Sequence, residues 1–432
     1  MNRHSIVLII IIAAVVSAYC FILFGGYPGA SDACDYGGLA RNLVNGKGFV
    51  INHVYPLSLV FLPLIPQPDC LWAPGFPIAL ALAFSIFGIS DNVMLGANIF
   101  LFLILIIAGY YLALRYTDPK TALVFLVFMG FSQNSYFTIL FGSPEILTAL
   151  FLTLSILFWH NNTNRLIVSA IFFSLAVLTR YQVIILLPVF LVFSGRAYKK
   201  LGIFALIVLA VNSVWLLRNL LVFGDPLFSL QRYGEFTKGM GLGDEYYYTY
   251  KSLEPAGIFT VLMNYPLLLL RKLIVGVPTF LSKLPLHLNS FGFFLVIWAF
   301  VFLRHDNQLG KILKFLVYGL SIYIFVCLFD GHHHRHLYIF DPLLIIAASA
   351  GFFDFLISFI ILSRFLSAIL RPSNIWARSS AFFKSYLVLF ITISFRWSTY
   401  NEIMSFRLRS LGLLSTSASI ITPKVSRICV CL

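Results

Sequence analysis

The chain has 432 residues, of which 60% are hydrophobic and only 11% are charged. Its mean hydropathy of +0.93 exceeds what a soluble protein of this length can bury, so the composition excludes a soluble enzyme and predicts a polytopic helical membrane protein. The net charge of +14 indicates cytoplasmic anchoring rather than a nucleic-acid-binding surface. We expect an all-α fold with about 10–12 transmembrane helices and additional helices on the extracytoplasmic membrane surface.

The first apolar segment, Ile6 to Phe24, has about the ~20 residues that a membrane span requires. A polar interlude follows it, and we assign residues 25–90 to a first extracytoplasmic loop. Within this loop Cys34 and Cys70 are either bridged in an oxidising compartment or two unpaired small apolar side chains.

A short helix is predicted inside this loop, because apolar residues recur there at i, i+3, i+4 and i+7. They are Tyr36, Leu39, Ala40 and Leu43. This single stripe predicts a helix of about 10–15 residues, which is too short to cross the bilayer and therefore lies on its surface. Ser31 or Asp32 can cap its start, while Gly46 and Gly48 can end it with positive φ.

The apolar run Pro74 to Phe87 determines on which side of the membrane every later loop lies. If it crossed the membrane, Arg115, Lys120 and Arg165 would lie outside, against the preference of basic loops for the cytoplasm. We therefore interpret this run as a segment that does not span the membrane.

With that choice, the remaining predicted spans alternate across the membrane. They are Val93 to Leu114, Thr121 to Leu140, Ile146 to His160, Leu166 to Thr179, Val183 to Phe193, Leu201 to Val222, a segment centred near Leu295, Ile312 to Phe329 and Leu337 to Leu362. Residues 223–290 form a second large extracytoplasmic region, in which Phe259 to Phe280 is a surface-lying or partly inserted segment. Residues 1–362 thus form the transmembrane domain. A basic tail, 363–432, holds nine Lys or Arg and one acid and has one possible extra span at Phe382 to Phe395.

Three acids on the predicted outer face are candidate catalytic residues. Asp32 can act as a general base or as a helix cap, and the spacing alone does not separate these roles. Asp35, one turn further on, is a solvated helix residue or a supporting acid. Glu145 follows G-S-P at the start of a helix, where an anion is favoured, and its alternative role is also capping.

Basic residues on the same face are candidate phosphate ligands. Arg180 ends the run A-V-L-T-R-Y at the outer surface and can hold a phosphate or simply reach the membrane interface. In the His-rich run from 332 to 336, Arg335 and His336 are favoured for a phosphate or headgroup contact. Metal binding is disfavoured there, because consecutive histidines lack the i, i+4 spacing of a helical metal pair.

At this point an ordered set of motifs becomes informative. The set comprises D-A-C-D-Y-G-G-L-A-R-N-L-V-N-G-K-G-F, A-P-G-F-P-I-A-L-A-L-A-F-S-I-F-G, G-S-P-E-I-L, S-L-A-V-L-T-R-Y, G-D-P-L-F and R-H-L-Y-I-F-D-P-L-L-I-I-A-A. It resembles the GT-C superfamily of membrane glycosyltransferases, in particular members similar to protein mannosyltransferases and aminoarabinose transferases. Its first-loop acid falls on Asp32, its second-loop acid on Glu145, and its basic residues on Arg180 and Arg335. Relatives often carry a second acid where this chain has Ala33.

The resemblance implies an inverting hexosyl or pentosyl transfer from a polyprenyl-phosphate-linked sugar to a hydroxyl of a lipid, glycan or protein acceptor. It places the protein in the plasma (inner) membrane with an extracytoplasmic site, Asp32 as base and no nucleic-acid partner. Acceptor binding is expected at Tyr246, Tyr247 and Tyr248, which can stack on a sugar; their alternative role is that of aromatic residues at the bilayer interface. No cofactor is assigned, and a divalent metal stays open because some members use one. The alternatives are a polytopic transporter and a non-catalytic protein that binds or assembles lipid-linked glycans.

Overall fold

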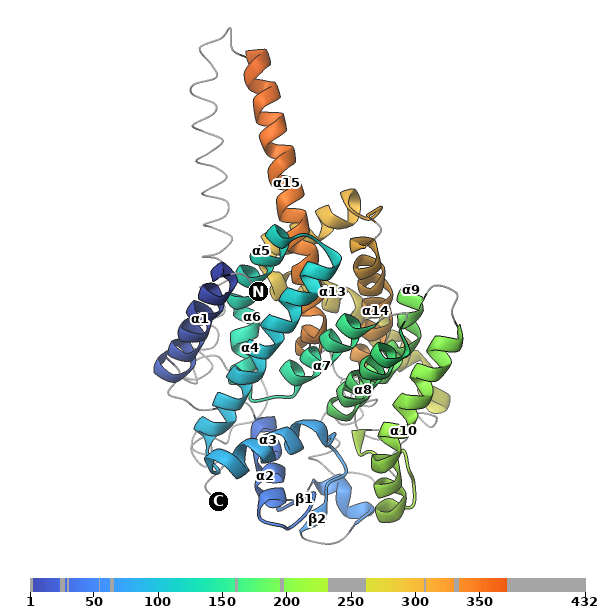
Figure 1. The fold of residues 1–432 in the computed structure, drawn as a ribbon. Helices are drawn as coiled ribbons and strands as arrows, with labels where there is room; N and C mark the ends of the chain where they lie inside the picture. Colours follow the sequence, from blue (N-terminus) through green and yellow to red (C-terminus); the bar gives the residue numbers. More distant parts are fainter. Residues whose placement is uncertain are drawn as a thin grey trace.

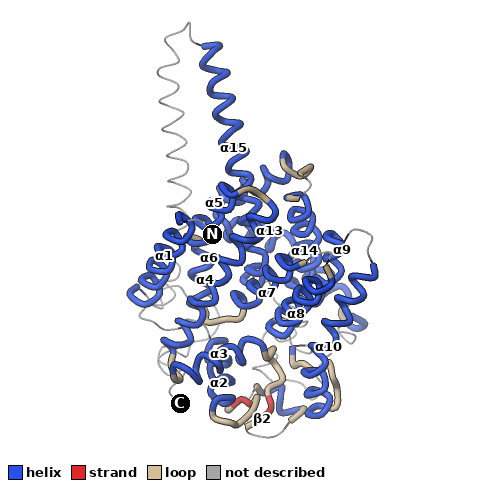
Figure 2. The backbone as a smooth tube through the Cα atoms, in the orientation of Figure 1, coloured by secondary structure: helices blue, strands red, loops and turns tan. Residues whose placement is uncertain are grey.

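The computed structural model describes residues 3–23, 28, 31–53, 55–62, 66–159, 162–194, 198–231, 262–306, 308–329 and 334–370. Regular structure in these ranges is almost entirely helical, as Figure 2 shows by its blue tube. The first half of the chain forms α1 (Arg3–Ala18), the π-helix η1 (Tyr19–Leu23), α2 (Ser31–Val44), β1 (Val50–Ile51), the 3-10 helix η2 (Pro56–Val60), β2 (Gln67–Pro68), α3 (Gly75–Phe87), α4 (Asp91–Tyr116), α5 (Pro119–Gly130), α6 (Gln133–Leu140), α7 (Glu145–Phe158) and α8 (Thr163–Thr179). The second half forms the 3-10 helix η3 (Tyr181–Phe190), α9 (Leu191–Ser194), α10 (Tyr198–Phe223), α13 (Pro266–Phe302), α14 (Leu309–Phe329), the 3-10 helix η4 (His334–Phe340) and α15 (Asp341–Leu370).

The protein is an all-α polytopic membrane protein, and its helices differ in length. Within the described residues, four helices are long and apolar enough to cross a membrane, or five if the bent pair α5 and α6 is one span. They are Arg3–Ile22, Asp91–Tyr116, Tyr198–Phe223 and Arg335–Leu362. Five shorter apolar helices accompany them, and one of these is Gly75–Phe87, the segment predicted not to span the membrane.

Two of the predicted spans are not single straight helices. The segment Thr121 to Leu140 was expected as one span, but its two helices meet at an angle of 48° because Ser132 caps a new helix after Gly130. The segment Val183 to Phe193 is largely the 3-10 helix η3, which contains Pro188. Since proline lacks the amide hydrogen that an α-helix needs, a regular α-helix is disfavoured at this position.

A small layer covers one end of the helix bundle, and we call it the α2 end. It consists of α2, α3 and the antiparallel pair β1 and β2, in which Val50 lies opposite Pro68 and Ile51 opposite Gln67. Figure 1 shows α3 running across this end beside α2, with the lower part of α10 next to the strands. The predicted short helix is confirmed as α2, and Gly46 and Gly48 follow it with φ of 71° and 83°.

The α2 end holds a small second hydrophobic cluster, while most buried side chains of α2 and α3 belong to the large core of the bundle. The small cluster combines side chains of the first loop with two from the segment after α10, namely Leu39, Ile51, Tyr55, Leu57, Cys70, Leu71, Phe228 and Leu230. The Leu230 amide donates to the Cys70 carbonyl at 2.8 Å, which ties the two segments together. Because Cys70 is a buried free thiol, the Cys34–Cys70 bridge considered from the sequence is not formed.

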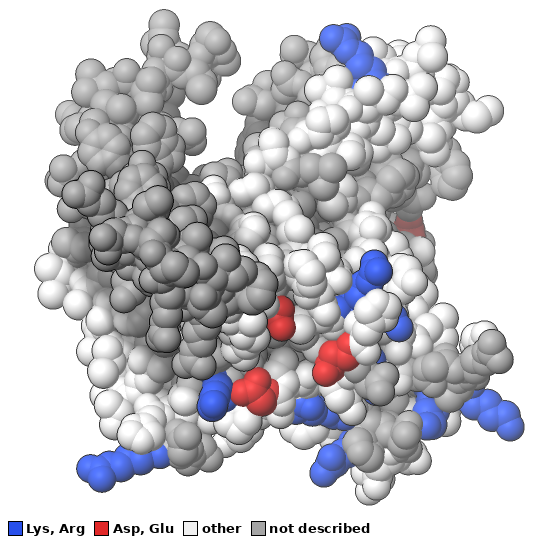
Figure 3. Space-filling model, turned by 90° about the horizontal axis from the view of Figure 1, so that it is seen from above, with Lys and Arg blue, Asp and Glu red and all other residues white. Residues whose placement is uncertain are grey.

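The opposite end of the molecule is seen in Figure 3, where charged side chains, some of opposite sign side by side, lie among uncharged described residues. Several expectations lie outside the described residues, including those for Tyr246 to Tyr248, the His332 and His333 positions and Phe382 to Phe395. The helix α15 continues to Leu370, past the boundary predicted at Leu362.

Candidate functional site

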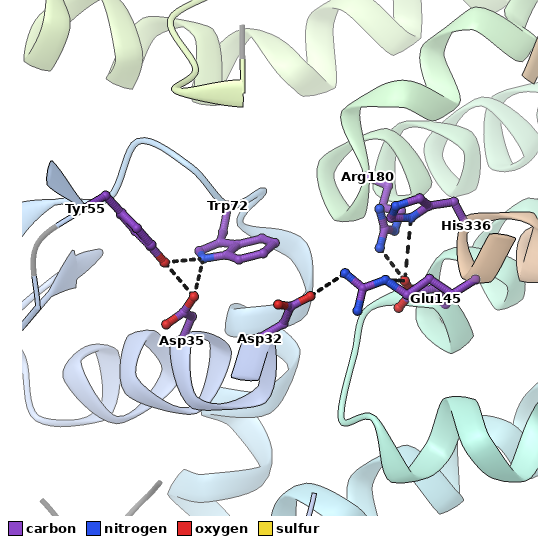
Figure 4. A network of polar contacts seen from close by, with 8 residues as sticks. Asp32, Asp35, Tyr55, Trp72, Glu145, Arg180 and His336 are labelled. Carbon is purple, nitrogen blue, oxygen red and sulfur yellow. Dashed lines mark hydrogen bonds and ion pairs between the residues drawn. The ribbon is translucent and has the colours of Figure 1, made fainter. Parts of the chain in front are cut away.

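The α2 end carries a network of charged side chains that come from four separate elements. Helix α2 supplies Asp32 in its first turn, α7 begins with Glu145, Arg180 follows the last residue of α8, and η4 supplies Arg335 and His336. Figure 4 shows Glu145, Arg180 and His336 close together on the side of Asp32 that faces away from Asp35. The structure thus brings together five residues from four distant parts of the sequence.

Glu145 is the centre of this network and is fully buried. One of its oxygens, Oε1, accepts a hydrogen bond from Arg180 Nη2 and lies 3.8 Å from both Arg335 Nε and His336 Nδ1. A buried carboxylate is stable as an anion when basic groups surround it in this way. The alternative role of Glu145 as a helix cap is not needed to explain its position, since no side-chain hydrogen bond caps α7.

Arg335 links this buried centre to Asp32. Its Nη2 donates to Asp32 Oδ2 at 2.5 Å, and both side chains are partly exposed, at 26% and 17%. Arg180 and His336 are more deeply buried. Of the two guanidinium groups, Arg335 is therefore the one that an incoming ligand reaches most directly.

Local packing explains why α7 and α8 present these residues. Gly142 takes a φ of 61° in the turn before Glu145, and α7 packs along α8. At the other end of the network, a Cβ on Gly75 would lie 2.6 Å from Thr179 Oγ1 and 2.9 Å from the Leu178 carbonyl oxygen. A glycine at the start of α3 therefore lets that helix touch the residues just before Arg180.

The segment η4 is held by buried polar contacts with α6. Tyr338 donates to Ser135 Oγ at 3.0 Å, and Asn134 Nδ2 donates to Asp341 Oδ2 at 2.6 Å. These bonds anchor both the 3-10 helix η4, which carries Arg335, and the start of α15. Because a break separates α5 from α6, α6 lies where it can make these contacts.

Ala33, the residue that follows Asp32 in α2, is buried. Its side chain is 3% exposed, and a Cβ built on Gly142 would lie 3.1 Å from its Cβ. The Ala33 side chain therefore packs on the turn that precedes Glu145, and a larger acidic side chain would not fit there without movement.

A second polar cluster surrounds Asp35, one turn along α2 from Asp32. Tyr55 donates to Asp35 Oδ2 at 2.5 Å, Trp72 Nε1 donates to the same oxygen at 3.2 Å, and His53 Nε2 lies 3.2 Å from Oδ1. Burial raises the pKa of Asp35, partly offset by Tyr55 and then by His53. The sequence did not predict His53, Tyr55 or Trp72 as site residues. The one indication of such a role was that each has a polar side-chain atom and lies in the first loop.

Beneath this cluster lies a fully buried carboxylate, Asp69. Its Oδ2 accepts the Trp72 amide at 2.8 Å. Burial raises its pKa to about 7, with the Trp72 amide and then Arg218 acting in the opposite direction. Asp69 supports the loop that carries Trp72 and does not reach the surface.

No group of three His, Cys, Asp or Glu side chains suited to one metal ion is found within the described ranges. The acids of the site are instead engaged by Arg335, Arg180 and His53. The expected acceptor residues Tyr246, Tyr247 and Tyr248 are not part of the described structure.

Comparisons with known proteins identify solved structures that have a similar fold. No family model matches the chain, and no curated protein matches it. Among solved structures, archaeal oligosaccharyltransferase AglB from Archaeoglobus fulgidus, in complex with an inhibitory peptide and a dolichol-phosphate, matches with a TM-score of 0.53 at 14% identity, covering 92% of this chain and 55% of AglB. ArnT from Cupriavidus metallidurans bound to undecaprenyl phosphate matches with a TM-score of 0.53 at 13% identity, covering 95% of this chain and 73% of ArnT.

These likenesses show that the chain shares its overall fold with AglB and ArnT, in agreement with the fold that the motif resemblance implied. The chain spans about half the length of the AglB oligosaccharyltransferase that it matches.

Proposed function

We propose that the protein is a glycosyltransferase that moves a sugar from a polyprenyl-phosphate donor to an acceptor hydroxyl. The observation that carries this proposal is the meeting of Asp32, Glu145, Arg180 and Arg335 in one partly exposed network. The two solved structures of the same fold are described as complexes with dolichol-phosphate and undecaprenyl phosphate. By this proposal residues 1–362 form the catalytic domain, with the α2 end on the extracytoplasmic side of the plasma membrane.

Arg335 and Arg180 are proposed to hold the lipid phosphate, with His336 supporting them. Each guanidinium carries five N–H donors, whereas the carboxylate of Glu145 cannot accept all of those that surround it. Guanidinium N–H groups can donate to phosphate oxygens, and the planar guanidinium suits phosphate geometry. As the bond between the sugar and the phosphate breaks, negative charge grows on the leaving phosphate, and these cations stabilise it.

Asp32 is proposed to act as the general base. It would take the proton from the acceptor hydroxyl while that oxygen attacks the anomeric carbon, and the bonding pair would leave with the lipid phosphate. In the structure Asp32 is bonded to Arg335, so a phosphate that draws Arg335 toward itself would release the Asp32 carboxylate. The base then becomes available when the donor is bound. Attack opposite the departing phosphate inverts the anomeric centre.

Binding of undecaprenyl phosphate to the protein in lipid nanodiscs, followed by native mass spectrometry, tests this proposal. Arg335→Gln is expected to weaken binding about ten- to hundredfold, because a charged hydrogen-bond donor is lost. Arg165→Gln is the matched control, since Arg165 is exposed at the other end of α8. Equal binding by wild type and Arg335→Gln would refute the phosphate site.

A further inference from the structure

The Asp35 carboxylate is held by side chains of the first loop and remains partly exposed. Oδ2 of Asp35 is held by Tyr55 and Trp72, and Trp72 Nε1 also lies 3.1 Å from the Tyr55 hydroxyl. Figure 4 shows Trp72 and Tyr55 on one side of the Asp35 carboxylate. The second oxygen, Oδ1, faces His53. The orientation of Asp35 is therefore set by three side chains of the first loop.

His53 is the exposed member of this cluster. Its side chain is 48% exposed, compared with 15% for Asp35. The imidazole ring packs edge-on against Tyr55, with ring centroids 5.0 Å apart and an interplanar angle of 81°. Because Nε2 is directed at Asp35 Oδ1, the proton of the neutral ring belongs on Nε2 and Nδ1 is a hydrogen-bond acceptor. The pair thus presents an imidazole nitrogen and a carboxylate edge to a ligand.

The position of this pair relative to Asp32 limits what the ligand can be. Residues three apart on a helix have their Cβ atoms about 5–6 Å from each other, and Asp32 and Asp35 are close enough to influence each other electrostatically. A hydroxyl bonded to Asp32 can therefore have a neighbouring hydroxyl of the same molecule bonded to Asp35 or His53. An acceptor with a single hydroxyl, such as a Ser or Thr side chain, can use only one of the two positions.

We propose that the Asp35–His53 pair is an acceptor-binding site for vicinal hydroxyl groups, and that the acceptor is consequently a carbohydrate. This inference rests on the proposed function, because it takes Asp32 as the group that meets the attacking hydroxyl. It adds the class of acceptor and assigns His53 and Asp35 to acceptor binding, not to donor binding or to proton removal. Protein acceptors become the competing outcome of the test.

Saturation-transfer NMR on the protein in nanodiscs loaded with undecaprenyl phosphate tests the site. The probes are a panel of methyl pyranosides and a Ser/Thr peptide of similar mass. Wild type is expected to bind at least one pyranoside more tightly than the peptide, and His53→Ala to weaken that binding about tenfold through loss of a hydrogen bond. His53→Gln, which keeps a side-chain hydrogen-bonding group, is expected to lie between them.

The controls separate this inference from the proposed function. His305→Ala removes an exposed histidine at the opposite end of the molecule and is expected to leave pyranoside binding unchanged. Undecaprenyl phosphate binding by His53→Ala is expected to equal that of wild type. No pyranoside binding, equal pyranoside binding by wild type and His53→Ala, or tighter binding of the peptide would each overturn the inference. Unweakened lipid-phosphate binding by Arg335→Gln would overturn the proposed function instead.

Discussion

Asp32 and Arg335 are 303 positions apart in the chain and form an ion pair with a distance of 2.5 Å between Oδ2 and Nη2. The pair joins the surface helix α2 to the 3-10 turn that precedes α15. It is also the exposed edge of a network whose centre, Glu145, is fully buried. The interior of the network therefore fixes the position of the residues that a lipid phosphate would meet.

The buried pair of Glu145 and Arg180 gives the first prediction. Glu145→Gln leaves the buried Arg180 without its anionic partner, and such a loss is expected to cost about 3–5 kcal/mol of unfolding free energy. Thermal unfolding in detergent measures this effect. The double variant Glu145→Gln, Arg180→Gln is expected to recover part of the stability, since no charge is left uncompensated, but not lipid-phosphate binding. Equal stability of wild type and Glu145→Gln would contradict the central position of this carboxylate.

Gly75 tests the contact between α3 and the end of α8. A Cβ at this position would overlap Thr179 and the Leu178 carbonyl, so Gly75→Ala is expected to lower stability by about 1–3 kcal/mol and to displace Arg180. Gly96→Ala in α4 is the matched control, because nothing lies within 4 Å of a Cβ there. Alanine at a free helical position is expected to be neutral or slightly stabilising. Comparison of unfolding temperature and undecaprenyl phosphate binding in the two variants checks this, and similar behaviour of both would argue against the close packing.

Asp69 predicts a dependence of stability on pH. Burial raises its folded-state pKa to about 7, whereas an unfolded Asp has a pKa near 3.9. Because the folded protein keeps this proton and the unfolded chain loses it, the stabilising contribution is complete below about pH 4 and is lost as the pH rises through about 7. Asp69→Asn, which cannot ionise, is expected to remove a decline of about 2–4 kcal/mol across this range. Unfolding temperatures of both proteins at pH 4.5 and 8 decide the matter, and parallel pH profiles would rule out a titrating Asp69.

The class of fold and the short helix α2 could be predicted from the sequence. The bend between α5 and α6 could not. The stripe Tyr36, Leu39, Ala40 and Leu43 has a single period and lies between capping residues and glycines, so its helix could be predicted. The bend between α5 and α6 depends on the capping of a new helix by Ser132. The polar residues from Ser132 to Ser135 interrupt the apolar run there, but their polarity alone does not distinguish a bent span from a straight one.

For the candidate site, the residues could be predicted from the sequence but their contacts could not. Asp32, Glu145, Arg180, Arg335 and His336 could be named because charged residues are scarce in this chain and stood out within ordered motifs. Their pairing could not be predicted, because it depends on how α2, α7, α8 and η4 pack in space. The contacts of Asp35 likewise depend on the fold of the first loop, which brings His53, Tyr55 and Trp72 to one carboxylate; the sequence shows only that these residues are polar and near.

Sugar transfer by Asp32→Asn tests the central claim most directly. The measurement is the turnover of radiolabelled polyprenyl-phosphate sugars by membranes that contain wild type, Asp32→Asn or the control Asp91→Asn, together with undecaprenyl phosphate binding by each. Loss of a general base is expected to lower turnover about 10²–10⁴-fold, while lipid-phosphate binding is retained because Arg335 and Arg180 remain. Wild-type turnover by Asp32→Asn would contradict the assignment of Asp32 as the base and, with it, the proposed active site.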